Sequence, residues 1–316
     1  MADLPDLSEL PRRQWMTALR ELVDARGVWT DISADHSSLL YGGGTTLLVS
    51  FELQADIRNS RDGAIPFGMA MADRNGWASL TIMATQATWY RDPALYAYFD
   101  SLIDEDVFDE FDRVVFYGEG MGGYAAGAYS VAAPGCSVVM VSPQATLDPR
   151  VTEWDPRFVS MRKTSFTDRF GFAPEMVEAA NDVFLIYNPD EDLDAMHAAL
   201  FARPGVTRFR CPLMGRDLVG SLDDMGLLEE AVELAAAGTL STETFAKAYR
   251  KRRDYPPYLR ALLTQVEDAG RLKLAAMLCR SVLARRNMPR MRKSLDKLIE
   301  QGVADGDTAA QDAAEA

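Results

Sequence analysis

The stretch from Asp112 to Ala126, DRVVFYGEGMGGYAA, decides the fold of this chain. An apolar run of β-forming residues, Val114 to Tyr117, leads into a turn with four glycines, and an alanine-rich helix follows. A strand that passes through a glycine-dense turn into a helix is the crossover unit of a parallel, doubly wound sheet. The sequence therefore predicts an α/β fold built around this strand.

The glycine spacing of the turn matches the G-x-S-x-G motif, with one change. In that motif a serine occupies a strained strand-to-helix turn, and small residues two positions before and after it let the backbone fold tightly. Here Gly118 and Gly122 are the small flanking residues, and Gly120 takes the place of the serine. Because glycine has no hydroxyl, no acyl-enzyme can form at this position.

Two alternative interpretations of the turn remain. Glu119 could serve as a carboxylate nucleophile, but a register moved back by one residue puts Tyr117 and Met121 where small residues are required. A phosphate-binding crossover is the other alternative, although the turn has no G-x-x-x-x-G-K-[ST] sequence.

The chain resembles the α/β-hydrolase superfamily, in particular bacterial hydrolase-like proteins with a Tyr-Gly-x-Ser-Met-Gly-Gly-Tyr-Ala-Ala elbow. The resemblance implies an acid after the strand that follows a lid, and then a histidine after the last strand. Asp190 or Asp192 matches the acid position, whereas Arg216 stands where the family would have its histidine. Arginine stays protonated and cannot act as a general base. We therefore expect a pseudoenzyme without catalytic residues or hydrolytic activity.

Other residues leave an active enzyme open as an alternative. An esterase, thioesterase or acyltransferase, acting for example on cell-surface carbohydrate, would need another nucleophile such as Cys136 or Ser142, which fit core and turn positions better. The two histidines are His36, upstream of the elbow, and His197, on the helix that begins at Leu193. We expect surface or capping hydrogen bonds from His197.

Reduction of phosphoadenosine phosphosulfate is a third function associated with similar bacterial chains. It would require a Ser-Gly-Gly-x-Asp-Ser loop and a Glu-Cys-Gly near the carboxyl end, and the sequence has neither. Cys279 instead falls inside an expected helix. The three cysteines are widely separated, so neither a disulfide framework nor a metal site is expected, and no cofactor is implied.

The charge of the chain is distributed unevenly. The net charge is −14, yet the segment from Lys247 to Lys297 has 15 lysines and arginines against four acidic residues, a net of +11. The other residues therefore carry about −25. The run Arg250, Lys251, Arg252 and Arg253 could bind an anionic partner weakly, although a solvated basic helix end is the simpler interpretation.

The pattern along the chain predicts three parts. Residues 1–220 form the hydrolase-like domain, with a lid insertion at about 148–180; residues 221–301 form a helical domain, and 302–316 a disordered tail. Within the first part we expect a helix from Ser8 to Arg26 with Ser8 as its N-cap. We also expect a hairpin of Leu39–Tyr41 and Thr45–Leu53.

Two further expectations concern a ligand-binding site and the cellular location of the protein. Tyr90 and Arg91 could lie at the carboxyl end of the sheet, where ligands bind in open α/β folds. The alternative for this segment is a helix start, with Asp92 as N-cap and Pro93 at the first helical position. The segment Met1–Asp6 contains two aspartates and lacks the basic and apolar regions of a signal peptide. This predicts a cytoplasmic protein. The ligand or protein partner is unknown.

Overall fold

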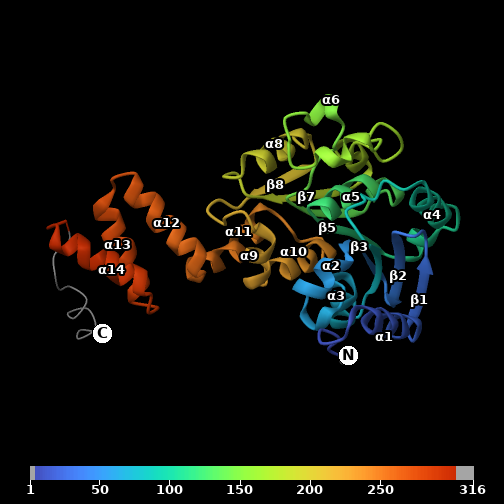
Figure 1. Cartoon of the computed structure of the whole chain (residues 1–316), viewed down its shortest axis with the longest axis horizontal. Helices are drawn as coiled ribbons and strands as arrows, with labels where there is room; N and C mark the ends of the chain where they lie inside the picture. Colours follow the sequence, from blue (N-terminus) through green and yellow to red (C-terminus); the bar gives the residue numbers. More distant parts are fainter. Residues whose placement is uncertain (1–3, 304–316) are drawn as a thin grey trace. The chain divides into compact units, whose positions relative to one another are not determined.

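A single eight-stranded sheet forms the centre of the structure, a computed structural model that describes residues 4–303 (Figure 1). The strand order is β1-β2-β4-β3-β5-β6-β7-β8; β2 runs antiparallel to β1 and β4, and all the other pairs are parallel. The strands are β1 (Gly27–Asp31), β2 (His36–Gly42), β3 (Thr46–Leu53), β4 (Ala78–Ala84), β5 (Arg113–Glu119), β6 (Ser137–Val141), β7 (Asp182–Tyr187) and β8 (Val206–Arg210). The predicted α/β fold with a mostly parallel sheet is confirmed.

The expected hairpin is wrong. β2 and β3 do not pair with each other, because β4 lies between them and pairs with both. The glycines that we assigned to a hairpin turn instead lie against the chain that enters β4: a Cβ on Gly42 would lie 2.5 Å from the Trp77 carbonyl oxygen, and one on Gly44 would lie 2.4 Å from the Gly76 carbonyl oxygen. The antiparallel pair at this edge is β1 with β2.

Helices cover both faces of the sheet. Trp15 and Leu19 of α1 and Met69 of α3 pack with Tyr41 and Met83 on one face. The helices α4, α5 and α8 contribute to the larger core cluster on the other face. The α-helices are α1 (Arg12–Asp24), α2 (Gln54–Ser60), α3 (Phe67–Asn75), α4 (Pro93–Asp104), α5 (Met121–Tyr129), α6 (Pro149–Thr152), α7 (Ala173–Met176), α8 (Asp192–Leu200), α9 (Leu218–Asp224), α10 (Leu227–Ala236), α11 (Thr242–Ala248), α12 (Pro256–Asp268), α13 (Leu272–Leu283) and α14 (Pro289–Glu300). The 3-10 helices are η1 (Asp62–Ala64), η2 (Val107–Glu110), η3 (Ser130–Ala132), η4 (Val159–Lys163), η5 (Val177–Ala179) and η6 (Tyr249–Asp254).

Two predicted helix starts have different outcomes. Asp92 caps α4 by accepting a hydrogen bond from the Ala94 N–H, and Pro93 takes the first helical position, as the sequence predicts. Ser8 is not the N-cap of α1, because that helix begins at Arg12 after Pro11. The Ser8 side chain bonds to Asp6 instead.

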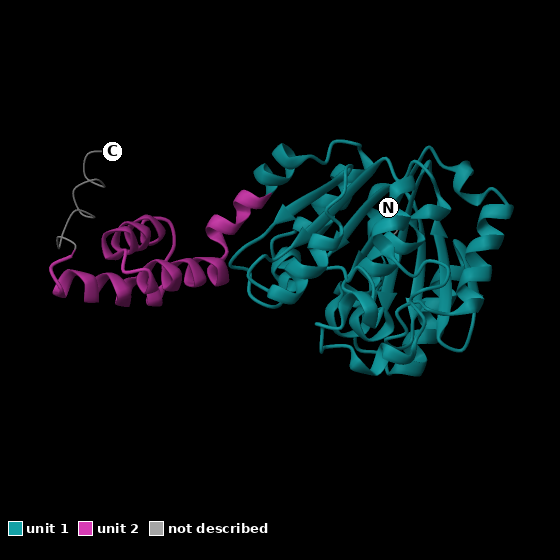
Figure 2. Cartoon of the chain, turned by 90° about the horizontal axis from the view of Figure 1, so that it is seen from above, with its two compact units in different colours: residues 1–248 teal, residues 249–316 magenta. Residues whose placement is uncertain are grey.

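The chain forms two compact units, residues 1–248 and 249–316 (Figure 2). The helices α9, α10 and α11, which we assigned to the helical domain, belong to the first unit. α10 packs against β5 and β6, and Phe245 of α11 stacks on Phe209 of β8 with ring centres 4.1 Å apart. The described part of the second unit contains η6 and α12–α14 around its own apolar core.

The sequence predicts a disordered tail and, because it has no apolar run of about 18 residues, no membrane-spanning segment. Most of the tail predicted to be disordered, residues 304–316, lies outside the described residues. Within residues 4–303, every helix is too short or too polar to cross a membrane.

Candidate functional site

The turn between β5 and α5 has the geometry of a nucleophile elbow. Gly120 lies between the strand and the helix with φ 51° and ψ −114°, a conformation that side chains rarely adopt. A Cβ on Gly118 would lie 2.1 Å from the Gly122 carbonyl oxygen, and one on Gly122 would lie 2.3 Å from the Phe51 carbonyl oxygen. Both flanking positions therefore exclude any side chain. A Cβ on Gly120 would meet no heavy atom within 4 Å, so the space above the elbow is open.

That open space belongs to a cavity of about 660 Å³ at the carboxyl ends of the central strands. Its wall contains Gly120, Met121 and Gly122 of the elbow. Five aromatic side chains line it: Phe51, Trp89, Tyr90, Tyr117 and Phe158. Six carboxylates also line it: Glu52, Asp56, Glu119, Asp217, Asp223 and Asp224. Among the described residues that line the cavity, Arg61 is the one cationic side chain, so the lining is strongly acidic.

Arg61 and Glu119 form an ion pair at the edge of the elbow. The Arg61 Nη2 lies 2.6 Å from Glu119 Oε1, which also accepts a hydrogen bond from the Tyr117 hydroxyl. A second nitrogen, Nη1, lies 3.7 Å from Asp223 Oδ2. The guanidinium lies over the Phe67 ring, which stacks on Tyr117. Glu119 is therefore held in an ion pair.

Glu52 is a buried carboxylate at the end of β3. It accepts hydrogen bonds from the Ser50 hydroxyl and from the backbone N–H groups of Phe67 and Gly68, at 2.7–2.9 Å. These two N–H groups are at the start of α3, where a helix favours negative charge. Burial nevertheless raises the pKa of Glu52 above its usual value.

The pKa values of two further carboxylates of the cavity are also raised. Burial raises the pKa of Asp56 and of Asp223, and the neighbouring charge of Glu119 raises both further. Arg61 opposes both shifts. The lining thus brings carboxylates together at an electrostatic cost, which nearby positive charge reduces.

Two buried side-chain oxygens of the cavity lack hydrogen-bond partners. Tyr90 is 0% exposed and its hydroxyl is unpartnered, and Gln144, at 4% exposure, has an unpartnered Oε1. The carboxylates of Glu52 and Asp56 are close enough to the Tyr90 hydroxyl to raise its pKa, after the larger effect of burial. Buried polar atoms are normally satisfied, so these two mark a place where a ligand could bind.

Arg91, the neighbour of Tyr90, is directed toward the segment between β6 and β7, where the sequence predicts a lid. Its Nε donates to the Ser165 carbonyl at 3.0 Å, and its guanidinium pairs with Asp168 and lies over the Phe166 ring. The side chain is 1% exposed. The structure therefore separates the two residues that the sequence suggested as one ligand-binding pair.

The predicted acid and base positions lie outside the lining of this cavity in the described structure. Asp190 Oδ2 accepts a hydrogen bond from the Leu213 N–H at 2.7 Å, and Asp192 is the first residue of α8. Arg216 is exposed, in the loop before α9. The elbow glycines are thus on the cavity wall without these three residues.

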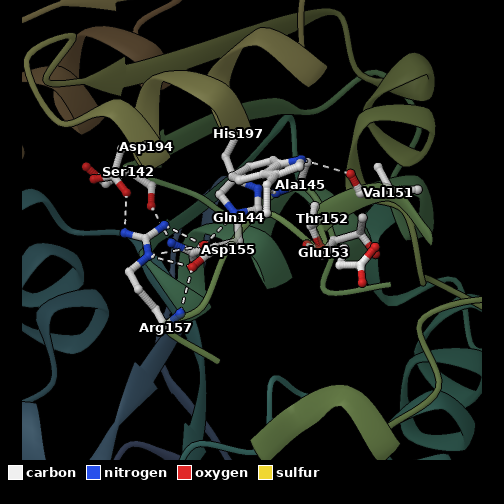
Figure 3. Close-up of polar contacts among 12 residues, drawn as sticks. Ser142, Gln144, Ala145, Val151, Thr152, Glu153, Asp155, Arg157, Asp194 and His197 are labelled. Carbon is white, nitrogen blue, oxygen red and sulfur yellow. Dashed lines mark hydrogen bonds and ion pairs between the residues drawn. The ribbon is translucent and has the colours of Figure 1, made fainter. Parts of the chain in front are cut away.

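His197 is buried, so the expected surface role is wrong (Figure 3). Its Nδ1 accepts a hydrogen bond from the Ala145 N–H at 3.2 Å, which leaves Nε2 to donate to Asp155 Oδ2 at 3.0 Å. Asp155 also pairs with Arg157, which reaches Asp194 of α8. Burial lowers the pKa of His197. His197 thus connects α8 to two segments: Nδ1 bonds to Ala145, after β6, and Nε2 bonds to Asp155, in the segment between β6 and β7.

His36 is also buried and fully bonded. Its Nδ1 lies 3.0 Å from Asp92 Oδ2, and its Nε2 lies 2.7 Å from the Thr88 hydroxyl. These contacts connect β2 to the start of α4. Neither histidine lines the cavity, as far as the described residues show.

Of the two alternative nucleophiles, Cys136 is buried and Ser142 is half-buried. Burial raises the pKa of Cys136 to about 12, and its thiol faces the Ser130 carbonyl. Ser142 has a positive φ of 45° directly after β6, and its hydroxyl is buried and unpartnered. Neither residue lines the cavity above Gly120. Within residues 4–303, no group of three or more metal-ligating side chains could hold a metal ion.

Four residues that line the cavity, and that sequence reasoning missed, are Glu52, Arg61, Gln144 and Asp223. Glu52 and Arg61 are close in the chain, but Gln144 follows β6 and Asp223 lies on α9, so the four come together only in the folded sheet with its helices. One usable indication was present: the carboxyl ends of parallel strands meet at one edge, and Glu52 is next to last in β3 while Glu119 is last in β5.

Comparison with solved structures finds chains of low sequence identity to this one. EstE1, a thermostable carboxylesterase cloned from a metagenomic library, is 15% identical over 73% of this chain and 97% of its own, with a TM-score of 0.44. A hormone-sensitive lipase from a metagenome library is 16% identical over 73% and 93%, with a TM-score of 0.45. The capsule O-acetyltransferase of Neisseria meningitidis serogroup A is 10% identical over 66% and 93%, also with a TM-score of 0.45.

These likenesses concern the fold alone. No protein-family model and no curated protein sequence matches the chain. Its own strand order and elbow geometry carry the conclusion: the chain has the α/β-hydrolase fold, with a glycine at the nucleophile position of the elbow.

Proposed function

We propose that this protein lacks hydrolytic activity and acts by binding a small molecule in the cavity above Gly120. The absence of a side chain at Gly120 carries the proposal. The elbow retains its strained turn and its crowded glycine flanks, but it offers no hydroxyl, thiol or carboxylate at its apex.

The surroundings of Gly120 support the same conclusion. General-base catalysis needs a group whose proton affinity suits neutral pH and that can reach the nucleophile. His36 and His197 have both ring nitrogens engaged elsewhere. Glu119, the carboxylate beside the elbow, is held by Arg61.

The acidic lining also opposes acyl transfer. The tetrahedral intermediate of that reaction develops negative charge, which enzymes stabilise with hydrogen-bond donors or positive charge. Here six carboxylates surround the elbow, and Glu52 occupies the N–H groups of Phe67 and Gly68. These charges would raise the free energy of an oxyanion.

The same argument disfavours a phosphate ligand. Gly118, Gly120 and Gly123 have the G-x-G-x-x-G spacing of a dinucleotide-binding turn. A pyrophosphate above this turn would face the six carboxylates with Arg61 as the one lining cation among the described residues. The spacing by itself is a weak indication, and the charge of the cavity outweighs it.

Turnover of ester reporters tests the proposal. The purified full-length protein should not hydrolyse p-nitrophenyl acetate, p-nitrophenyl butyrate or acetylthiocholine above the buffer rate. Turnover that is lost in Ser142→Ala or Cys136→Ala would support the alternative, an esterase or acyltransferase with an unusual nucleophile. Any turnover that saturates with substrate and requires folded protein would overturn the proposal.

We also propose that the basic stretch in the second unit binds anionic partners weakly. Arg250, Lys251 and Arg253 are exposed. Arg252 differs: its guanidinium donates to the Tyr249 carbonyl at 2.7 Å and lies over the Tyr249 and Tyr258 rings. Arg252 thus supports η6 internally. The negative charge of the other residues competes with an anionic partner for this stretch, so the binding should be weak, and salt should weaken it further.

A further inference from the structure

We propose that the ligand of the cavity above Gly120 is a small organic amine, bound in its protonated form. This inference rests on the proposed binding function and adds the chemical class of the ligand. Three independent features of the cavity carry it: its charge, its two unpartnered polar atoms and its aromatic wall.

The charge of the cavity selects a cation. Its six carboxylates face one arginine among the described lining residues, and that arginine already pairs with Glu119 and Asp223. A monocation in this space would gain from the carboxylates that Arg61 does not neutralise. An anion would be repelled by them.

The unpartnered atoms select a hydrogen-bond donor. The hydroxyl oxygen of Tyr90 and the Oε1 of Gln144 are buried, face no protein donor and belong to lining residues. Gln144 Oε1 only accepts hydrogen bonds, and the Tyr90 hydroxyl can accept as well as donate, whereas an ammonium group offers three donors and no acceptor. An ammonium group could therefore donate to Gln144 Oε1 or to the Tyr90 hydroxyl, in a cavity that Asp56 also lines.

The aromatic wall selects an organic ligand. Trp89 and Phe158 meet edge to face with ring centres 4.7 Å apart, and Phe51 and Tyr117 line the same cavity. Aromatic faces attract cations and pack against hydrocarbon. The cavity volume of about 660 Å³ is within the range of small-molecule sites and is far larger than the volume of a metal ion.

Calorimetric titration with a matched pair of probes tests the inference. Tyramine and 4-hydroxyphenylacetate share the same ring and differ in the charge at the end of the side chain. The full-length protein should bind tyramine and should bind 4-hydroxyphenylacetate at least tenfold more weakly. Putrescine and agmatine extend the probes to amines without a ring.

Two variants localise the binding. Tyr90→Phe should weaken amine binding about tenfold, which corresponds to one lost hydrogen bond to a charged group. It should not lower the melting temperature, because the hydroxyl that it removes has no partner. Asp56→Asn should weaken binding severalfold and reduce its dependence on salt. Tyr41→Phe is the matched control: its hydroxyl bonds to Arg26 and Asp73 outside the cavity lining, so stability should fall while amine binding stays unchanged.

The outcomes separate this inference from the proposed function. Three results would overturn the inference that the ligand is an amine. These are binding of 4-hydroxyphenylacetate that equals or exceeds that of tyramine, amine binding that neither Tyr90→Phe nor Asp56→Asn changes, and no binding of any of the three amines. Each of these results leaves the absence of ester turnover intact. Ester turnover, by contrast, would overturn the proposed function even if an amine binds.

Discussion

Arg61 reaches from the loop after α2 to Glu119, the residue directly before Gly120, with 2.6 Å between Nη2 and Oε1. The two side chains are only 12% and 19% exposed, so the pair is largely shielded from water. The ion pair connects the end of β5 to the loop after α2. It also places the one positive charge of the described lining beside two of the six carboxylates, Glu119 and Asp223.

Replacing Arg61 tests this arrangement. Arg61→Met should lower the free energy of unfolding by about 3 kcal/mol, because it leaves Glu119 as a largely buried charge without its cation. The double variant Arg61→Met with Glu119→Gln should recover much of the loss. Urea denaturation of the variants measures both values. A single variant as stable as the wild type would mean that the pair is not formed in solution.

Restoring a serine to the elbow should not restore activity. Gly120→Ser has room for its side chain, but its φ of 51° is strained for serine and should cost about 1–2 kcal/mol of stability. No ester turnover is expected, because no base faces the new hydroxyl. Gly205→Ser, at an exposed turn with φ 86° and open space around its Cβ, is the matched control for backbone strain.

The combination Gly120→Ser with Arg216→His tests the base position separately. Arg216 lies outside the described cavity lining, so we expect the double variant to remain inactive as well. Activity in the double variant alone would show that the loop before α9 reaches the elbow. Equal activity in the single and double variants would mean that another residue serves as the base.

The fold could be predicted further than the site. The run Val114–Tyr117 and the glycines after it identify β5 and α5, because a local pattern determines a local turn. The hairpin prediction failed because the insertion of β4 between β2 and β3 depends on contacts far along the chain. The pairing of Glu119 with Arg61 depends on the same long-range topology. No spacing in the sequence encodes it.

The buried histidines predict how stability depends on pH. Burial lowers the folded-state pKa of His197 and of His36 below the ordinary value of 6.5. The stability that the neutral rings provide is therefore present above about pH 6.5 and is lost as the pH falls toward their folded-state pKa values.

His197→Gln should accordingly flatten this loss. Between pH 7 and pH 5 the melting temperature of the wild type should fall more than that of His197→Gln, and the variant that also carries His36→Gln should fall least. Scanning calorimetry at several pH values measures the slopes. Parallel slopes for all three proteins would show that neither ring titrates on unfolding in this range.

Truncation tests the division of the chain. A protein ending at Ala248 should stay folded and soluble, because residues 1–248 form a compact unit. One ending at Gly220 should aggregate, since it removes the buried α10 residues Leu227, Leu228 and Val232 and exposes the apolar surface of the sheet beneath them. Light scattering and circular dichroism distinguish the two. Equal solubility would place the boundary at residue 220, as the sequence suggested.

The shorter protein also tests the basic stretch. Weak binding to heparin at low salt should disappear when residues 249–316 are removed. Exchanging Arg250, Lys251 and Arg253 for glutamine in the full chain should have the same effect. Undiminished heparin binding in both would place the anion-binding surface elsewhere.

Intact-mass analysis after treatment with a fluorophosphonate tests the central claim most directly. A serine activated by a base in an α/β-hydrolase fold forms one covalent adduct per chain, whereas the elbow of this protein has only Gly120 at that position. We predict that the mass of the folded protein stays unchanged under conditions that fully label a serine esterase. A single adduct on one serine, prevented by prior unfolding and accompanied by ester turnover, would contradict the account.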